Sequence, residues 1–121
     1  PRRKGSPTGT APSARQVFVS GMIGWDAEGR FQTDDFVGQA RQAPANIVAV
    51  LREAGAGPEH IVRMTWYVLD RREYLDAGAA LGAAYRDVIG RHYPTMSAVQ
   101  VAGLMEERAR VEIEVTAVVP E

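Results

Sequence analysis

Residues 61–69 read IVRMTWYVL, and this run of β-branched and aromatic side chains predicts a β-strand. The Gly57-Pro58 pair before it is typical of a turn. Successive side chains of a strand point to opposite faces, which separates an apolar set from a polar one. The apolar set is Val62, Met64, Trp66 and Val68, and the polar set is Arg63, Thr65 and Tyr67. The strand is therefore expected to divide a hydrophobic core from a second, more polar surface.

Residues 111–119, VEIEVTAVV, repeat this division near the C-terminus. Val111, Ile113, Val115 and Ala117 share one side of the predicted strand, and Glu112, Glu114 and Thr116 share the other. Amphipathic helices can cover the apolar sides, whereas the opposite sides carry too many polar groups for an ordinary core. The polar side is therefore where a functional site is expected.

The first helix is predicted over residues 34–54, where apolar residues recur at helical spacing and Gly55 follows as the C′ residue. Pro44 lies inside this pattern. A proline in a helix interior removes a backbone donor and costs about 3 kcal/mol. The helix is therefore expected to kink at Pro44 or to form in two pieces.

The second helix is predicted to begin at Asp70, and its apolar stripe ends at Gly90. Asp70 and Glu73 have the spacing of a capping box. Gly78 and Gly82 lie on the stripe without the pattern of a phosphate-binding loop. They are therefore expected to allow close packing of this helix on the sheet.

Three further strands complete the predicted fold. Residues 16–23, QVFVSGMI, are β-rich, and a turn leads from them into a hairpin partner at 30–32. Another strand is predicted at 96–101. The resulting order, ββαβαββ, indicates an α+β fold.

The composition indicates one domain over residues 1–121, with a flexible or extended N-terminal segment at 1–14. Fourteen basic and 15 acidic residues give a formal charge of −1, so no general positive field attracts nucleic acid. The absence of cysteine removes thiol chemistry and cysteine-type zinc sites, and it favours a cytoplasmic location. The apolar runs are far shorter than the roughly 20 residues of a membrane helix. The expected partner is therefore a small molecule.

Few residues have the spacing of known catalytic groups. His60 and His92 lack metal-ligand spacing, so no metal site is predicted. Glu112 and Glu114 share one side of a strand, roughly 7 Å apart, where a carboxylate can position a water or accept a proton. Salt bridges at an interface, for example with Arg63, are the alternative explanation for this pair.

Five segments are characteristic in combination. They are VFVSG at 17–21, QARQ at 39–42, Asn46-Ile47, EAGAGPEHIVRMTWYV at 53–68 and VEIEVTAVV at 111–119. Together they resemble the Rid family of reactive intermediate deaminases, also called the YjgF family, along residues 17–120. Residues 94–113 also follow the spacing of the family's signature.

This resemblance implies a chorismate-mutase-like fold, in which one sheet is backed by two helices and assembles as a homotrimer through its other face. It also implies three clefts between subunits that bind small carboxylates. Well-studied members hydrolyse enamines or imines there to the ketoacid and ammonia. The resemblance implies no metal and no organic cofactor.

The family's functional positions carry over in part. Glu112 matches the cleft glutamate that orients the attacking water, Ser20 and Gly21 match cleft-wall positions, and Ala98 stands where many members have cysteine. Met96 occupies the position of the arginine that grips the substrate carboxylate. A thioether cannot form that charge-assisted pair. The family's tyrosine on the N-terminal side of the cleft has no counterpart.

Met96 leaves two interpretations open. Either the cleft lacks an arginine and holds a different ligand, or Arg63, Arg108 or Arg110 replaces the missing cation. In the second case the iminoacid deaminase activity is retained. Two functions are considered for the trimer as a whole, a deaminase-like hydrolase for a less acidic or more apolar substrate and a non-catalytic metabolite-binding or regulatory protein. Ribonuclease or translation-inhibitor activity is the weakest candidate, because the chain has no basic face and no histidine pair suited to phosphodiester cleavage.

Overall fold

A computed structural model of the chain describes residues 13–121. Most of the segment predicted to be flexible or extended, residues 1–14, lies outside this range, and Ala14 is already the first residue of a strand. The elements in chain order are β1 (Ala14–Ile23), α1 (Phe36–Glu53), a 3-10 turn η1 (Pro58–His60), β2 (Ile61–Val68), α2 (Arg71–Val88), β3 (Thr95–Gln100) and β4 (Val111–Pro120).

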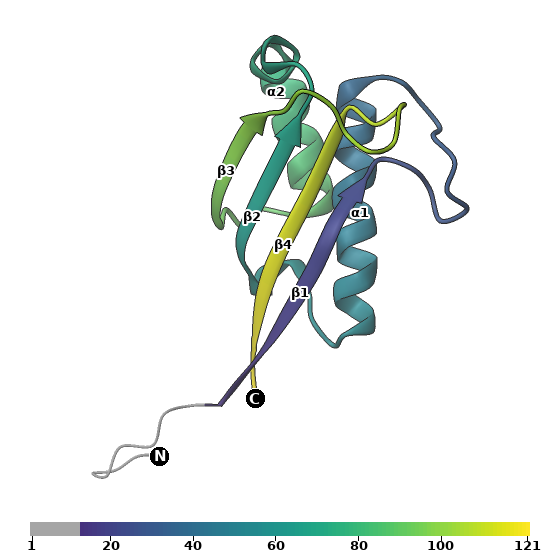
Figure 1. Ribbon diagram of the computed structural model, residues 1–121. Helices are drawn as coiled ribbons and strands as arrows, with labels where there is room; N and C mark the ends of the chain where they lie inside the picture. The colour runs from purple at the N-terminus through teal and green to yellow at the C-terminus, as the bar shows by residue number, and fades with distance from the viewer. Residues whose placement is uncertain (1–12) are drawn as a thin grey trace.

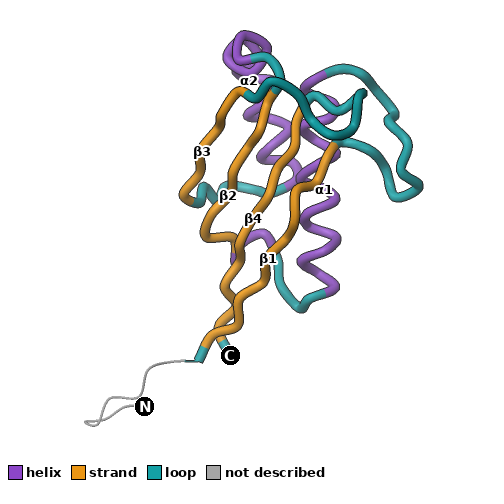
Figure 2. The backbone as a smooth tube through the Cα atoms, in the orientation of Figure 1, coloured by secondary structure: helices purple, strands orange, loops and turns teal. Residues whose placement is uncertain are grey.

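The four strands form one mixed sheet in the order β1-β4-β2-β3. β4 pairs antiparallel with both β1 and β2, whereas β3 pairs parallel with β2 and forms an exposed edge. Both helices cover the same face of this sheet, and the other face is open in the described chain (Figures 1 and 2). The predicted α+β architecture, one sheet backed by two helices, is confirmed.

One predicted strand is reduced to a single bridge. The hairpin after β1 forms, but Trp25 and Phe31 make an isolated antiparallel pair, so the sheet has four strands where ββαβαββ predicts five. The Asp26 carboxylate organises the turn by accepting from the backbone N–H groups of Glu28 and Arg30 at 2.9 and 3.0 Å. The hydrogen bond from the Arg30 N–H is the main cause of the lowered pKa of Asp26. The side chain satisfies these donors, and no further strand pairing is needed.

The helix break lies in α2 and not in α1, which corrects the prediction at Pro44. Helix α1 runs as one helix through Pro44, whose ring is fully buried in the core. The helical φ is close to the value that the ring fixes, so α1 continues past Pro44 although one backbone donor is lost. In α2, Gly78 has φ 45° and ψ −118°, which interrupts the helix. Only glycine adopts this conformation without strain.

The core lies between the helices and the covered sheet face, where the apolar side chains of β4 predicted from alternation are buried. In β2 the alternation holds from Met64 onward, but Val62 is 47% exposed and Ile61 takes the buried position. The register between β2 and β4 shifts here, from Ile61 opposite Ala117 to Arg63 opposite Thr116. The extra residue of this bulge turns the Val62 side chain away from the core.

Candidate functional site

A second bulge interrupts β1 at Ser20 and Gly21. The register with β4 passes from Val19 opposite Val115 to Met22 opposite Ile113, so these two residues together face Glu114. A bulge of this kind bends the strand and redirects the neighbouring side chains. Ser20 and Gly21, which the family resemblance implies as cleft-wall residues, therefore form an irregular backbone segment of β1.

Gly21 lies directly against the carboxylate of Glu112. A Cβ atom at position 21 would lie 2.0 Å from Oε2 of Glu112, so any side chain there would displace the carboxylate. Glu112 is half-buried on β4, between Ile23 of β1 and Tyr67 of β2. It lines a hollow of about 280 Å³ with Gly21, Trp25 and the exposed Met105. The structure thus brings Gly21 and Glu112, two residues that the family resemblance implied for the cleft, into one place.

Asn46 of α1 holds one wall of this hollow. Its side-chain amide donates to the carbonyl oxygens of Ile23 and Trp25 at 3.0 and 2.8 Å. These carbonyl groups lie where β1 ends and the chain turns away from the sheet. Asn46 belongs to one of the segments behind the family resemblance. Its side-chain amide therefore fixes the backbone around Trp25.

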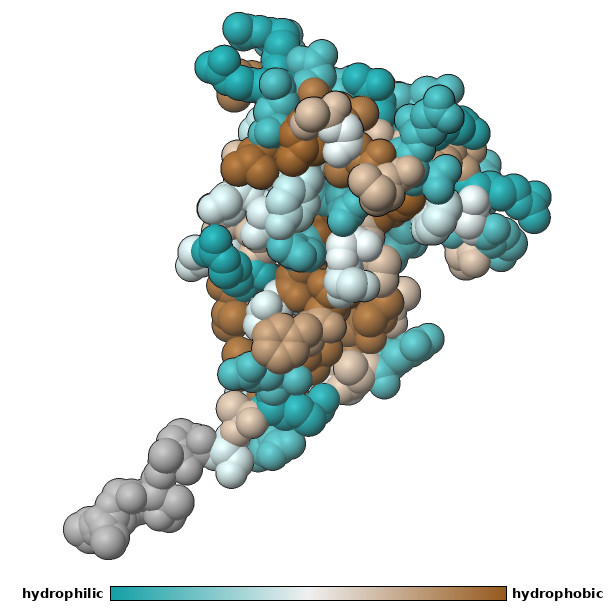
Figure 3. Space-filling model, in the orientation of Figure 1, coloured by the Kyte–Doolittle hydropathy of each residue, from teal (hydrophilic) through white to brown (hydrophobic). Residues whose placement is uncertain are grey.

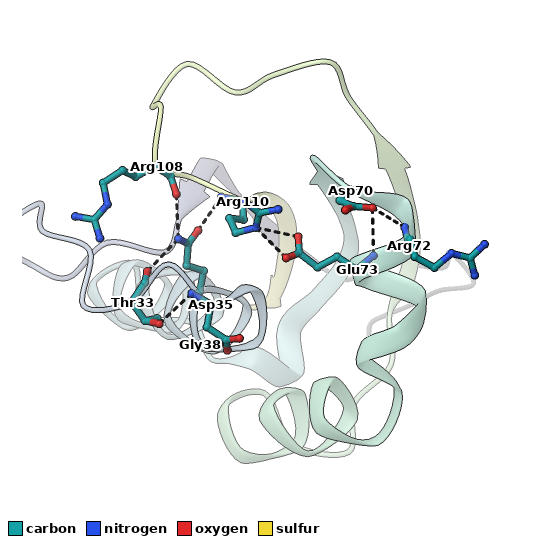
Figure 4. Close-up of polar contacts among 9 residues, drawn as sticks. Thr33, Asp35, Gly38, Asp70, Arg72, Glu73, Arg108 and Arg110 are labelled. Atoms are coloured by element: carbon teal, nitrogen blue, oxygen red, sulfur yellow. Dashed lines mark hydrogen bonds and ion pairs between the residues drawn. The ribbon is translucent and has the colours of Figure 1, made fainter.

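Gln39, the first residue of the QARQ segment, holds the loop that leads into β4. Its fully buried amide donates to the carbonyl oxygens of Thr33 and Arg108 at 3.1 and 3.0 Å and accepts from the Arg110 N–H at 2.7 Å (Figure 4). Every polar atom of this side chain therefore has a partner inside the protein. Because Arg110 directly precedes β4, the network sets the position of the strand that carries Glu112.

Ser20 lies in a neighbouring hollow on the same face. This hollow, of about 390 Å³, is also lined by Arg63, Thr65 and Glu114. Next to it, the Tyr67 hydroxyl donates to Oε1 of Glu114 at 2.6 Å, and this bond is the main cause of the raised pKa of Tyr67. Among residues 13–121, neither glutamate forms an ion pair with Arg63. This face carries both polar and apolar side chains (Figure 3).

Met96 and Ala98 lie on the opposite, helix-covered side of the sheet. In the parallel ladder between β2 and β3, Met96 is paired with Met64 and Ala98 with Trp66. Met64 and Trp66 are both buried against the helices, so the two β3 residues share their side. A single chain therefore does not bring these two predicted site residues to the carboxylate of Glu112.

The two histidines bind backbone atoms. Nδ1 of His60 accepts from the Gly57 N–H at 2.9 Å, and Nε2 of His92 lies 2.7 Å from the Ile61 carbonyl oxygen. Among residues 13–121, no three His, Asp or Glu side chains gather closely enough to hold a metal ion. None of the helices in that range is long and apolar enough to cross a membrane.

A family model described as Endoribonuclease L-PSP matches residues 9–119. The goat protein named 2-iminobutanoate/2-iminopropanoate deaminase is 32% identical over 105 residues, which cover 86% of this chain and 73% of the relative. A RutC family protein from Pyrococcus abyssi is also 32% identical, with 84% and 76% covered. The chain belongs to the Rid family, also called YjgF. The family resemblance of the five segments is therefore confirmed.

Solved Rid structures have the same fold. The Rid-family protein YyfB from Yersinia pestis has a TM-score of 0.75 at 30% identity, with 85% of this chain and 77% of that chain covered. The YjgF protein from Escherichia coli has a TM-score of 0.72 at 32% identity, with 85% and 80% covered. The YjgF-like fold predicted from the sequence is thus shown.

In this Rid protein, the three arginines proposed as replacement cations do not lie beside Met96. Arg108 pairs with Asp34 at 2.8 Å, and Arg110 pairs with Glu73 at 2.9 Å. Arg63 lines the hollow of Ser20 on the other side of the sheet. The Glu73 carboxylate, predicted to complete a capping box, binds Arg110 instead, while Asp70 caps α2 by accepting from the N–H groups of Arg72 and Glu73 (Figure 4).

The arginine that shares a hollow with Met96 is Arg86 of α2, which the sequence reasoning missed. One signal was available in the sequence. The residues three and four positions away on the helix are Gly82, Ala83, Ile89 and Gly90, so Arg86 has no acidic neighbour along the helix.

Proposed function

We propose that this Rid protein binds a small molecule and hydrolyses an enamine or imine in a cleft between subunits, with release of ammonia. The observation that carries the proposal is the Glu112 carboxylate lying against Gly21, at a backbone bulge that leaves room for no side chain. Relatives about 30% identical are named 2-iminobutanoate/2-iminopropanoate deaminases, which supports the reaction class.

The proposed assembly is a homotrimer that buries the open sheet face. Phe18 on this face is 72% exposed in the single chain, and an aromatic ring of this size gains most from burial at an interface. Because Glu112 and Met96 lie on opposite sides of one sheet, a second copy is needed to bring them together. In the trimer, the β3 edge with Met96 and Ala98 would close the hollow of Glu112 on a neighbouring copy, giving three clefts.

The proposed chemistry needs one water and no metal or organic cofactor. Glu112 orients a water and accepts its proton while the oxygen attacks the carbon of the C=N bond. The C=N π electrons pass to nitrogen, and Glu112 gives its proton to that nitrogen, which yields a neutral carbinolamine. Glu112 then transfers the hydroxyl proton of the carbinolamine to the nitrogen, the C–N bond breaks as the C=O bond forms, and carbonyl product and ammonia leave. An enamine enters the same sequence after tautomerisation, in which carbon gains a proton and nitrogen loses one.

Met96 sets the proposed substrate apart from the iminoacids of the named relatives. A thioether offers no charge-assisted bond to a carboxylate, whereas it packs well against apolar groups. The substrate is therefore proposed to be less acidic or more apolar at the end that contacts Met96. The same residue supports a second candidate, a non-catalytic trimer that binds a metabolite in this cleft.

The proposed location is the cytoplasm, because the chain contains no cysteine for disulfide bonds.

Ammonia release from a panel of enamines and imines tests the reaction. Glu112→Gln is expected to lower turnover of any accepted substrate by about 100-fold or more, because the proton acceptor is lost. Glu114→Gln is the matched control, since it removes the same charge from the same strand in the neighbouring hollow, and turnover should persist. A parent inert on every substrate, with iminoacid turnover gained by Met96→Arg, would support the binding protein instead.

Light scattering after size exclusion tests the assembly. The parent is expected to have three times the mass of one chain. Phe18→Asp places a charge in the proposed interface, so this variant should be smaller and should lose ammonia release with the cleft. A parent that stays monomeric at high concentration would refute the shared cleft and with it the proposed reaction.

A further inference from the structure

The hollow of about 280 Å³ around Glu112 is lined by acids and apolar groups. In the part of the chain that the structure describes, its lining includes the carboxylates of Glu106 and Glu112 but no basic side chain. Neither carboxylate forms a salt bridge within residues 13–121. The hollow therefore repels a ligand carboxylate and attracts a positive charge.

The arginines of the loop that leads into β4 are bound to other carboxylates. Arg108 pairs with Asp34 at 2.8 Å, and Nε of Arg110 donates to both carboxylate oxygens of Glu73, at 2.9 and 3.0 Å. Neither arginine lines the hollow. An arginine that is already paired with a protein acid has less to offer a ligand carboxylate. Residues 101–110 therefore add no free cation to the site.

The strand proposed to close the hollow from a neighbouring copy also carries no charge. β3 reads TMSAVQ over Thr95–Gln100 and contains no acidic or basic residue. Arg86 shares a hollow with Met96, but its guanidinium lies back along α2, with Nη1 3.2 Å from the position of a Cβ atom added to Gly82. The assembled cleft is therefore expected to keep the negative sign of the Glu112 hollow, and removal of Arg86 tests this expectation.

The apolar part of the lining includes Trp25 and Met105. The Trp25 ring packs against Phe31 with ring centroids 5.9 Å apart, and the guanidinium of Arg108 lies 5.2 Å from the centre of the Phe31 ring. Met105 is 98% exposed in the single chain, and its unbranched thioether adapts to apolar groups of different shapes. Tryptophan is also the side chain whose ring face binds cations best. These residues therefore suit a ligand with an apolar arm and a positive charge.

We infer that the substrate of the Glu112 cleft is an iminium ion that has an aryl or alkyl arm and no carboxylate. The inference rests on the proposed function, because it names the substrate class of the same cleft. The protonated C=N group lies beside the Glu112 carboxylate, and the arm packs between Trp25 and Met105. The carboxylate of an iminoacid, by contrast, needs the arginine that Met96 replaces.

Hydrolysis of an iminium ion needs only water. Its nitrogen arrives protonated, so it becomes neutral when the water oxygen attacks the carbon and Glu112 accepts the water proton. Glu112 gives this proton to the nitrogen. It then accepts the hydroxyl proton as the C–N bond breaks and the C=O bond forms, so one carbonyl product, one ammonia and one proton leave.

Titration calorimetry with three probes tests the sign of the cleft, on the purified chain in its natural assembly. The probes are the cation 2-phenylethylammonium, neutral 2-phenylethanol and the anion 3-phenylpropanoate. The parent is expected to bind the cation about tenfold or more tightly than the alcohol, because a charge-assisted bond is gained, and the anion most weakly. Glu112→Gln should bind the cation and the alcohol with similar affinity. Glu114→Gln, the same change in the neighbouring hollow, should bind like the parent.

Met105 allows the sign of the cleft to be reversed. Its side chain is almost fully exposed, so substitutions there should leave the fold intact, which circular dichroism checks. Met105→Arg should weaken binding of 2-phenylethylammonium and strengthen binding of 3-phenylpropanoate, each by about tenfold or more. Met105→Gln, a neutral side chain of similar length, should keep the parent's order of affinities. Arg86→Gln should keep it as well, because that guanidinium lies outside the hollow.

Two imines that differ only by a carboxylate test the substrate class. Flavin-dependent oxidases release 2-phenylethan-1-imine from 2-phenylethylamine and 2-imino-3-phenylpropanoate from phenylalanine. The parent is expected to accelerate ammonia release from the first imine with a kcat/KM about tenfold or more above that for the second. Met105→Arg should narrow this ratio, whereas Met105→Gln should preserve it.

Three results would overturn the inference. The first is a parent that binds 3-phenylpropanoate more tightly than 2-phenylethylammonium, and the second is a parent that binds none of the probes. The third is a kcat/KM for the iminoacid equal to or above that for 2-phenylethan-1-imine, and its loss in Arg86→Gln would show that α2 supplies the cation. Ammonia release from the iminoacid alone would leave the proposed function standing. Selective binding of the cation at Glu112, without ammonia release from either imine, would refute the hydrolase and leave the cation site standing.

Discussion

The two faces of the sheet differ in how their side chains are buried. On the face covered by α1 and α2, Ile113 is fully buried and packs within one continuous core. On the other face, Glu114, the next residue of the same strand, is exposed, as is Phe18. The covered face therefore derives its order from packing within the chain, whereas the open face has groups still available for other molecules.

This difference separates two kinds of site. The Glu112 hollow lies on the open face and is held from behind by amides of α1, so its geometry is fixed but its cover is absent in one chain. A second hollow, lined by Arg86 and Met96, lies on the covered side of the sheet. The open-face site should therefore depend on assembly.

The largest effect is expected from Ile113→Ala, which removes a fully buried side chain from the covered face. Such truncations cost about 2–5 kcal/mol, so a loss of about 3 kcal/mol in the free energy of unfolding is expected in urea. Glu114→Ala is the neighbouring control on the open face. It breaks one exposed bond with Tyr67 and should cost no more than about 1 kcal/mol. Equal losses would contradict the contrast between the faces.

A smaller effect is expected at the break in α2. Gly78→Ala forces a side chain into φ 45°, ψ −118°, at a cost of about 1–3 kcal/mol. Nothing crowds this position, so the whole loss would come from backbone strain. Gly82→Ala should instead raise stability by about 0.5–1 kcal/mol, because its backbone is helical and alanine favours the helix. Thermal unfolding of both variants checks the difference. A stable Gly78→Ala variant would mean that α2 can close into a regular helix.

Strand alternation predicted the two faces well because side-chain direction in a strand is local. It placed Glu112 and Glu114 on the open face and Ile113 in the core, as observed. It failed at Val62, where a bulge reverses the direction of one side chain. A bulge depends on how two distant strands pair, so a single strand's sequence does not contain it.

Helix-breaking residues predicted the course of the helices less reliably than alternation predicted the strand faces. Pro44 lies in an unbroken helix and Gly78 in a broken one, although proline is the stronger helix breaker on intrinsic propensity. Burial of the Pro44 ring in the core offsets its missing hydrogen bond. Tertiary packing therefore determines that the chain stays helical at Pro44, and the neighbouring sequence does not indicate this packing.

The candidate site was predicted in part. The family resemblance identified Glu112 and Gly21, which are in contact, and it also identified Met96 and Ala98, which are on the other side of the sheet. Their side follows from the parallel register of β3 with β2, which alternation within β3 cannot give. The hollow beside Arg86 was missed because Gly78 and Gly82, which line it, were interpreted as sites of close packing on the sheet.

The smallest effects are expected at high pH. A tyrosine on each side of the sheet has a raised pKa, and the main cause of the rise differs between the two. On the covered side, burial is the main factor that raises the pKa of Tyr85 to about 12 from its ordinary value of 10.0. On the open face, the hydrogen bond to Glu114 is the main factor that raises the pKa of Tyr67. In both cases the folded protein favours the neutral phenol. The stability this gives is complete below pH 10 and is lost as the pH rises through the folded-state pKa.

Tyr85→Phe tests the covered side. Two pKa units correspond to at most about 2.7 kcal/mol, and solvent at this half-exposed ring reduces the expected contribution to about 1 kcal/mol. The free energy of unfolding should therefore fall less steeply between pH 10 and 12 in Tyr85→Phe than in the parent. Glu114→Leu tests the open face, because it should return the ultraviolet titration of Tyr67 to its ordinary range and leave that of Tyr85 in place. If Glu114→Leu lowered both pKa values, the two faces would be coupled through the sheet, and sites on opposite sides could not be treated as independent.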